Sequence, residues 1–311
     1  MISLSQSKVK TFLRCPKKYE FRYVQNLVPK EKPLPMERGL WIHECLEAFY
    51  KGRNWKRTAL LRLKLNFRSL FDEEREALGD LPSEVERIVE SYTRYWDDTE
   101  WEILAVEKEF AVKLKSGLTL KGKIDLVIRD ALGVWVVEHK SNKRLPTEGP
   151  RIPDPQTTIY NYALRSMGLE GMGTIHNHIR TTPPKTPYVL KTGGLSKARG
   201  IDTDYYTYRQ ALKREGLDLK DYRDILLKLK RDDRFFRRFR IPWKKTAVKS
   251  MMADYKTVAW MIDNTKQFPR HISQMCVRDC FYFQLCMVEL HGGNASALKR
   301  QKYSVTEKTY A

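Results

Sequence analysis

Three residues that could carry out metal-dependent chemistry stand close together in the chain: Asp125, Glu138 and Lys140. Hard divalent cations such as Mg²⁺ take oxygen ligands, usually one or two carboxylates together with water and a substrate phosphate. Asp125 and Glu138 could supply those carboxylates, and the metal would lower the pKa of a bound water. Lys140 would orient that water or stabilise charge on the phosphate. The set fits a magnesium site that cuts phosphodiesters; the alternative is a surface hairpin with an exposed Glu/Lys pair.

The residues around this set predict a β-hairpin that would hold it. Residues 122–128 and 133–137 are apolar, β-branched runs separated by a turn-like segment. Alternate residues of a strand share one face, so Glu138 and Lys140 point the same way while His139 points away. The apolar run before Glu138 carries the charged pair toward a buried sheet, which favours the metal site.

Two expected helices bring further polar residues to the hairpin. Asp154 suits a helix N-cap and Pro155 suits the first helical turn, which would place Gln156 and Tyr160 on one helical face. Upstream, His43 lies near the start of another expected helix. Each has an ordinary alternative, because His43 could be a packed or solvated histidine, and the other two could be plain helix positions.

The order and spacing of these residues resemble a known family, the RecB-type branch of the PD-(D/E)XK nucleases. Within it, the likeness is to CRISPR-associated and phage-encoded RecB-like exonucleases. The resemblance is carried by Gly39-x-x-x-His43, Asp125, Glu138-x-Lys140 and Gln156-x-x-x-Tyr160.

This resemblance implies both a fold and a set of roles. The fold would be α/β, with a restriction-endonuclease-like core whose mixed sheet is flanked by helices, and with helical elaborations at both ends. Asp125, Glu138 and His43 would bind Mg²⁺ or Mn²⁺, and Lys140 would be the catalytic lysine. Gln156 and Tyr160 would support the site and contact DNA.

The chain contains five cysteines, of which three form a Cys-x3-Cys-x5-Cys cluster at Cys276, Cys280 and Cys286. Cys15 stands far from them in sequence, followed by a proline, and Cys45 lies two residues after His43. Four thiolates can hold an iron–sulfur cluster or a zinc ion. Buried free thiols and disulfides are the alternatives, but disulfides are not expected in a reducing cytosol.

RecB-like nucleases with an iron–sulfur cluster have this layout of one N-terminal and three C-terminal cysteines. By that likeness, Cys15, Cys276, Cys280 and Cys286 bind a [4Fe-4S] cluster that joins the two ends of the chain. Some relatives have two residues between the first two C-terminal cysteines and this chain has three, so zinc stays open as an alternative. The cluster would be structural, because hydrolysis needs no electron transfer, and Cys45 is interpreted as packing.

Charge points to a polyanionic partner. The 311 residues carry a formal net charge of +20, and neutralising phosphates releases counterions, so nucleic acid is favoured. Anionic membrane binding is the competing interpretation, but there is no clear basic amphipathic anchor, and the nuclease-like residues favour nucleic acid. No apolar run is long enough to span a bilayer. Basic residues alternate with aromatic ones between residues 228 and 245, as in single-strand binding surfaces. The alternative there is an amphipathic helix with its aromatic residues in the core.

We expect one nuclease domain over residues 1–291. It would comprise a helical region at 1–100, a catalytic core at 101–180, and a helical and cysteine-cluster region at 181–291. Residues 292–311 are polar and basic and are predicted to be a disordered tail. Glu109, in an expected strand, is interpreted as an ordinary strand charge.

The function predicted from these features is that of a metal-dependent DNA exonuclease acting on single-stranded or resected ends. The family likeness suggests recombination, repair or phage DNA processing, with recombination or replication proteins as partners and with oligomers among relatives. Two alternatives remain: a CRISPR-adaptation nuclease that trims DNA with integrase partners, and a non-catalytic DNA-binding scaffold. RNA cleavage is a weaker option. No secretory signal is recognised, so a cytoplasmic protein in a prokaryotic or phage-infected cell is expected.

Overall fold

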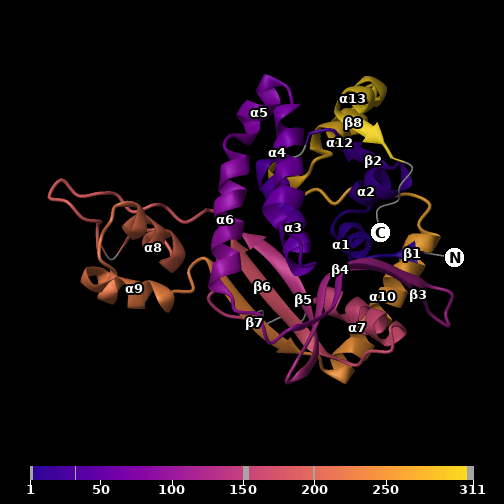
Figure 1. The fold of residues 1–311 in the computed structure, drawn as a ribbon. Coiled ribbons are helices and arrows are strands. Elements are labelled where there is room, and N and C mark those ends of the chain that lie inside the picture. The colour runs from indigo at the N-terminus through magenta and orange to yellow at the C-terminus, as the bar shows by residue number, and fades with distance from the viewer. Residues whose placement is uncertain (1–2, 32, 150–153, 199, 307–311) are drawn as a thin grey trace.

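The structure is a computed structural model, and it describes residues 3–31, 33–149, 154–198 and 200–306 (Figure 1). The strands are β1 (Ser3–Leu4), β2 (Leu27–Pro29), β3 (Glu102–Lys113), β4 (Thr119–Asp130), β5 (Gly133–Asn142), β6 (Gly171–Arg180), β7 (Phe236–Pro242) and β8 (Tyr303–Val305). The helices are α1 (Gln6–Arg14), α2 (Pro16–Tyr19), α3 (Leu34–Tyr50), α4 (Leu61–Arg68), α5 (Asp72–Leu78), α6 (Leu81–Tyr95), α7 (Pro155–Ser166), α8 (Tyr205–Arg214), α9 (Arg223–Lys230), α10 (Lys245–Asn264), α11 (Met275–Asp279), α12 (Phe283–Leu290) and α13 (Ala295–Lys302). Three single turns of other helix types complete the elements: η1 (Glu20–Val24), η2 (Lys56–Leu60) and η3 (Leu219–Tyr222).

A mixed six-stranded sheet forms the centre, in the order β1-β4-β5-β6-β7, with β3 also paired to β4. The expected hairpin is β4 and β5, which pair antiparallel, while β5 and β6 pair parallel through a crossover that contains α7. The predicted α/β fold, a mixed sheet flanked by helices, is confirmed.

Apolar side chains on both faces of the sheet hold the helices in place. On one face, Leu126, Val137 and Ile175 pack against α3 and α6. On the other, Ile124 and Val136 pack with α1, α7 and α10. A sheet covered on both faces buries its central strands, which is why residues 134–139 of β5 are a continuous buried run.

Helix α6 shows why these segments are helical. Its buried positions Val85, Ile88, Val89 and Tyr92 recur at the spacing of one helical face, and Pro82 sits in the first turn, where a missing N–H is tolerated. The exposed residues of the opposite face are largely charged. Helix α6 lies within the region that we expected to be helical, residues 1–100.

A segment near the start of the chain packs against its C-terminal segment, outside the central sheet. Strand β2 pairs antiparallel with β8, and the Tyr282 hydroxyl donates a hydrogen bond to the Leu27 carbonyl at 2.6 Å. Phe21, Leu285 and Tyr303 fill a separate small core there. Much of the segment that we predicted to be a disordered tail from residue 292 is thus folded as α13 and β8; residues 307–311 of that tail lie outside the described part.

The basic and aromatic segment at 228–245 is not the continuous helix that was one of its two interpretations. Its first residues end α9, and residues 236–242 form β7, the last strand on its side of the sheet. Phe235 and Phe236 are buried in the core under α6, so these two rings are not available for base stacking. Helices α8 and α9 form a small lobe with its own core, which projects beyond α6 (Figure 1).

No helix in the described part of the chain is both long and apolar enough to cross a membrane.

Gly173 in β6 tests how tightly the sheet is packed. A Cβ there would lie 2.8 Å from the Trp135 ring and would also clash with the Ile241 carbonyl. We expect Gly173→Ala to lower the free energy of unfolding by about 1–3 kcal/mol, because overpacking forces side chains and backbone to shift. Gly200→Ala is the matched control, since a Cβ at Gly200 meets nothing within 4 Å. Equal urea midpoints for the two variants would contradict this packing.

Candidate active site

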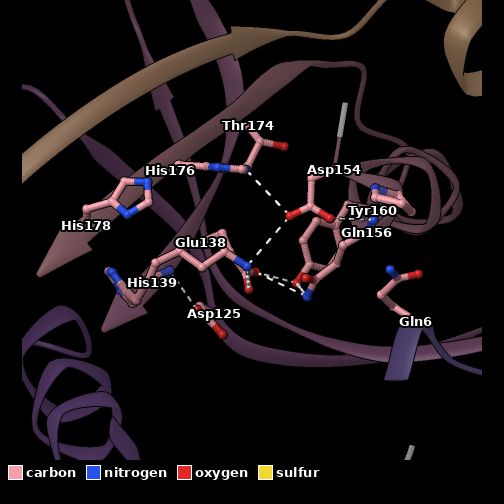
Figure 2. Close-up of polar contacts among 12 residues, drawn as sticks. Gln6, Asp125, Glu138, His139, Asp154, Gln156, Tyr160, Thr174, His176 and His178 are labelled. Carbon is pink, nitrogen blue, oxygen red and sulfur yellow. Dashed lines mark hydrogen bonds and ion pairs between the residues drawn. The ribbon is translucent and has the colours of Figure 1, made fainter. Parts of the chain in front are cut away.

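The site begins where strands β4 and β5 diverge. Their ladder ends at the pair formed by Leu126 and Val137, and Asp125 is the first residue beyond it. The Asp125 carboxylate accepts a hydrogen bond from the backbone N–H of His139 at 2.9 Å, in place of a ladder bond (Figure 2). This hydrogen bond fixes the carboxylate between the separating strands, close to the start of the Glu138–Lys140 segment.

A second acid, Glu107 of β3, reaches the same point. Its backbone φ is +50°, in the left-handed region that non-glycine residues seldom adopt, and the β3–β4 ladder skips the pair that it would form with Asp125. Sparsely populated backbone conformations cluster at functional sites. Glu107 was not among our predicted site residues. The acid that we considered in this strand, Glu109, lies two residues further on and is exposed.

His43 of α3 completes a group of three possible metal ligands with Glu107 and Asp125. One ligand atom from each lies within 4.8 Å of the other two. The His43 Nδ1 atom is 3.7 Å from Asp125 Oδ2. Two carboxylates and an imidazole are donors that Mg²⁺ and especially Mn²⁺ accept, so the residues present fit a divalent cation.

Glu138 lies between this group and α7, and its carboxylate binds Lys140 and residues of α7. Its Oε1 atom pairs with the Lys140 ammonium at 2.9 Å, and its Oε2 accepts from Gln156 Nε2 at 3.4 Å. The Tyr160 hydroxyl also donates to Oε2 and accepts from Gln156 (Figure 2). The structure thus brings together all the predicted catalytic residues, with Glu138 bound to Lys140 and the α7 pair. Its role as a metal ligand stays a prediction.

Helix α7 presents Gln156 and Tyr160 as its sequence predicted. The Asp154 side chain accepts a hydrogen bond from the Gln156 N–H at 2.9 Å, which is the expected N-cap, and Pro155 occupies the first turn. Asp154 also lies 3.7 Å from the Lys140 ammonium and 3.8 Å from His176 Nε2. The cap residue therefore fixes the helix and contributes charge to the site.

Negative charge is concentrated in this buried space. Burial, and then repulsion from Glu138, raise the pKa of Asp125 well above its usual range. Burial lowers the pKa of Lys140, but the carboxylates of Glu138, Asp154 and Asp125 outweigh it and raise that pKa above its ordinary value. The ammonium is therefore fully protonated at neutral pH. A cation bound here would offset the electrostatic repulsion that remains between the carboxylates.

Four of the five cysteines gather away from the carboxylates, at the C-terminal end of α1. Cys15, Cys276, Cys280 and Cys286 line one pocket, together with basic residues such as Arg270. Burial raises the pKa of the Cys280 thiol, and the nearby Cys276 and Cys15 raise it further. Cys45 is fully buried in the core beneath α3, in agreement with its interpretation as a packing residue.

Comparison with known proteins gives the family. A family model described as the PD-(D/E)XK nuclease superfamily matches residues 3–286, most of the 311 residues. The chain belongs to the PD-(D/E)XK nuclease superfamily. The predicted superfamily is thus confirmed, and membership implies a nuclease that acts on DNA. The RecB-type branch stays a prediction. No curated protein matches the chain.

Two solved structures are similar at low identity. The first, described as "Crystal structure of SSO0001", is 12% identical, covers 91% of this chain and 85% of its own, and has a TM-score of 0.34. The second, a "Putative exonuclease" from Eubacterium rectale, is 14% identical, covers 89% of this chain and 93% of its own, and has a TM-score of 0.39. Because both TM-scores are low, we draw no conclusion about this protein from either structure.

A buried network behind the nuclease site fixes the orientation of His139. Arg238 of β7 can only donate hydrogen bonds, so the Asn177 oxygen must face its Nε, at 3.2 Å. The Asn177 amide nitrogen then donates to His139 Nδ1 at 2.7 Å and to the Tyr92 hydroxyl. His139 consequently carries its proton on Nε2. Burial, the nearby His43 and Arg238 hold its pKa well below the usual range, so it is neutral.

Arg238 itself is held in an aromatic and acidic cage. Its guanidinium pairs with both carboxylate oxygens of Asp98 and lies 4.0 Å from the ring centre of Trp96 and 4.2 Å from that of Trp101. The cage residues come from the loop between α6 and β3, so the network links that loop to the sheet. No sequence pattern indicated this link, because its members lie 140 residues apart.

The cage gives a stability test. Asp98 is only 12% exposed, and removing the partner of a buried charge costs about 3–5 kcal/mol. We therefore expect Arg238→Gln to lower the free energy of unfolding by that amount. In the matched control, Arg129→Gln, the lost partner is exposed Glu102, and such pairs contribute about 1 kcal/mol or less. Chemical denaturation measures both; a loss in Arg238→Gln no larger than in the control would show that the cage is not a structural support.

Proposed function

We propose that the protein is a metal-dependent DNA exonuclease that hydrolyses phosphodiester bonds at single-stranded or resected DNA ends. The observation that carries the proposal is the meeting of His43, Glu107 and Asp125 within 4.8 Å, beside the Glu138–Lys140 pair. Membership of the nuclease superfamily supports the hydrolytic activity. The net charge of +20 supports a polyanionic substrate.

In this proposal His43, Glu107 and Asp125 hold Mg²⁺ or Mn²⁺, with Glu138 as a further ligand. A bound divalent cation supplies an activated water and offsets charge on the phosphate. Lys140 is a protonated cation next to Glu138, so it can orient that water or neutralise charge on the phosphate. Gln156 and Tyr160 hold Glu138 in place by hydrogen bonds, and they also border the space that a DNA strand would enter.

The preference for free single-stranded or resected ends, and a place in recombination, repair or phage DNA processing, rest on the family resemblance. The basic surface supplies a physical reason for strong, salt-sensitive binding to a nucleic-acid backbone. Recombination or replication proteins are the proposed partners. End-labelled single- and double-stranded DNA, with and without free ends, separates exonuclease from endonuclease action and gives the polarity.

The roles within the site can be tested by substitution. Lys140→Ala should lower kcat/KM for labelled DNA by about 100-fold or more, the usual effect of losing one preorganised charge that stabilises the transition state. Glu107→Gln should raise the Mn²⁺ concentration needed for half-maximal cleavage by about tenfold, because one carboxylate ligand is lost.

Glu109→Gln is the matched control, two residues away on the same strand and exposed, and it should cleave at the wild-type rate. If Lys140→Ala and Glu138→Ala both cleave labelled DNA at the wild-type rate, the assignment of the site is wrong. A Glu107→Gln variant with wild-type metal dependence would remove Glu107 from the ligand set alone.

We also propose that Cys15, Cys276, Cys280 and Cys286 hold a [4Fe-4S] cluster. All four line one pocket. Four thiolates can hold an iron–sulfur cluster or a zinc ion. The resemblance to RecB-like nucleases that carry an iron–sulfur cluster favours the cluster. Such a cluster would stabilise the fold and would take no part in hydrolysis.

The cluster proposal predicts a coloured protein. Protein purified without oxygen should be brown, with broad visible absorption and about four iron atoms per chain. Cys280→Ser should lose the colour and melt at lower temperature, whereas Cys45→Ala should keep the colour, because Cys45 lies in the core beneath α3. A colourless wild-type protein with one zinc per chain would replace the iron–sulfur cluster with zinc.

A further inference from the structure

Strand β4 has an open stretch on one edge. Strand β3 pairs with β4 along one edge, from Thr119 to Arg129. On the other edge β1 pairs only with residues 119–120, and β5 pairs only from Leu126 onward. Among the described residues, 121–125 therefore have no strand partner on this second edge. Unpaired backbone at a sheet edge needs another partner, such as water or a ligand.

A polar pocket of about 170 Å³ lies along this open stretch. A water molecule needs about 10–15 Å³ on the same measure, so a hydrated phosphate group has room there. Its walls come from the first turn of α1, from β4 and from α7: Ser5, Gln6, Ser7, Phe110, Lys121, Gly122, Lys123, Gln156, Ile159 and Tyr160. Lysines and polar groups line it, and the described lining residues include no carboxylate.

Lys121 lines this pocket, and no carboxylate among the described residues pairs with its ammonium. Lys8 lies close enough for the two ammonium groups to repel each other, and its own ammonium donates a hydrogen bond to the Ser3 carbonyl at 3.1 Å. Burial and the neighbouring Lys121 lower the pKa of Lys8. Two like charges held together without an acid favour an anion between or beside them. Lys123 differs, because its ammonium pairs with Glu107.

The pocket adjoins the candidate active site. Tyr160 and Gln156 form part of its wall and also hydrogen-bond to Glu138, and Figure 2 shows Gln6 on the far side of this pair from Glu138. Lys123 connects the pocket to Glu107 from the β4 side. A DNA strand with one phosphate at the carboxylates would therefore bring a neighbouring phosphate to the pocket.

We propose that this pocket binds a phosphate of the substrate strand next to the bond that is cut, through Lys121, with the neighbouring Lys8 adding positive charge. The inference rests on the proposed nuclease function and adds a substrate subsite to it. The phosphate is either an internal diester or a terminal monoester. Binding it would place the scissile bond relative to the catalytic residues, so the pocket would set where the strand is cut.

Binding measured without cleavage tests the subsite. In a Lys140→Ala background, fluorescence anisotropy would follow oligonucleotides with one methylphosphonate at successive internal positions, or with a 5′-phosphate, a 3′-phosphate or hydroxyl ends. We expect the loss of one of these phosphate charges to raise Kd by about tenfold, as for the loss of a charge-assisted hydrogen bond. Lys121→Gln should remove that dependence and reduce the slope of log Kd against log salt by about 1. The sensitive position tells a terminal phosphate from an internal one.

Lys213→Gln is the matched control, because Lys213 is exposed on α8, which Figure 1 places far from β1. Lys8→Gln should behave like Lys121→Gln, and thermal melts check that each variant is folded. The subsite is refuted if Lys121→Gln keeps the same phosphate dependence as its parent, or loses no more affinity than Lys213→Gln. If the wild-type protein cuts no DNA but this phosphate dependence persists, the nuclease proposal fails and the subsite stands.

Discussion

The divergence of β4 and β5 at Asp125 is the constraint on which the rest of the site depends. Beyond Leu126 the ladder cannot continue, because the Asp125 carboxylate takes the His139 N–H that a ladder would use. The separation makes room for Glu107 and His43 beside Asp125. It also leaves the edge of β4 open between β1 and β5, where the basic pocket lies. The end of the β4–β5 ladder therefore makes room both for the group of His43, Glu107 and Asp125 and for the pocket beside it.

Holding such a site together requires stability from elsewhere. Glu107 adopts a left-handed backbone, which costs of order 1–3 kcal/mol, and the carboxylates of Asp125 and Glu138 repel each other. Apolar packing on both faces of the sheet and the caged Arg238 provide the rigid surroundings that keep these groups in position. The hydrogen bonds of Glu138 with Lys140 and Tyr160 then fix the orientation of its carboxylate.

The sequence predicted what local rules determine. The hairpin, the cap at Asp154 and the alternation of Glu138 and Lys140 follow from strand period and helix capping, and the structure contains all three. Glu107 was missed because simple alternation cannot anticipate a residue with φ of +50°. The strand at 236–242 was missed because alternating basic and aromatic residues suit a strand, a helix or a binding surface equally. The cage of Arg238 depends on contacts between distant segments, which no local pattern encodes.

Helix α1 connects the pocket beside the candidate active site to the cysteine group. Its first turn lines the basic pocket, and Cys15 follows its last residue directly. Nine helical residues rise about 13 Å, so the pocket and the cysteine group are joined by one short, stiff element. The Tyr255 hydroxyl contacts both Gln6 and the Pro155 carbonyl, which ties the start of α1 to the start of α7. Cross-linking Cys15 to the C-terminal cysteines would therefore restrain the helix that forms one wall of the substrate space. A purely structural cluster would in this way bear on catalysis without taking part in it.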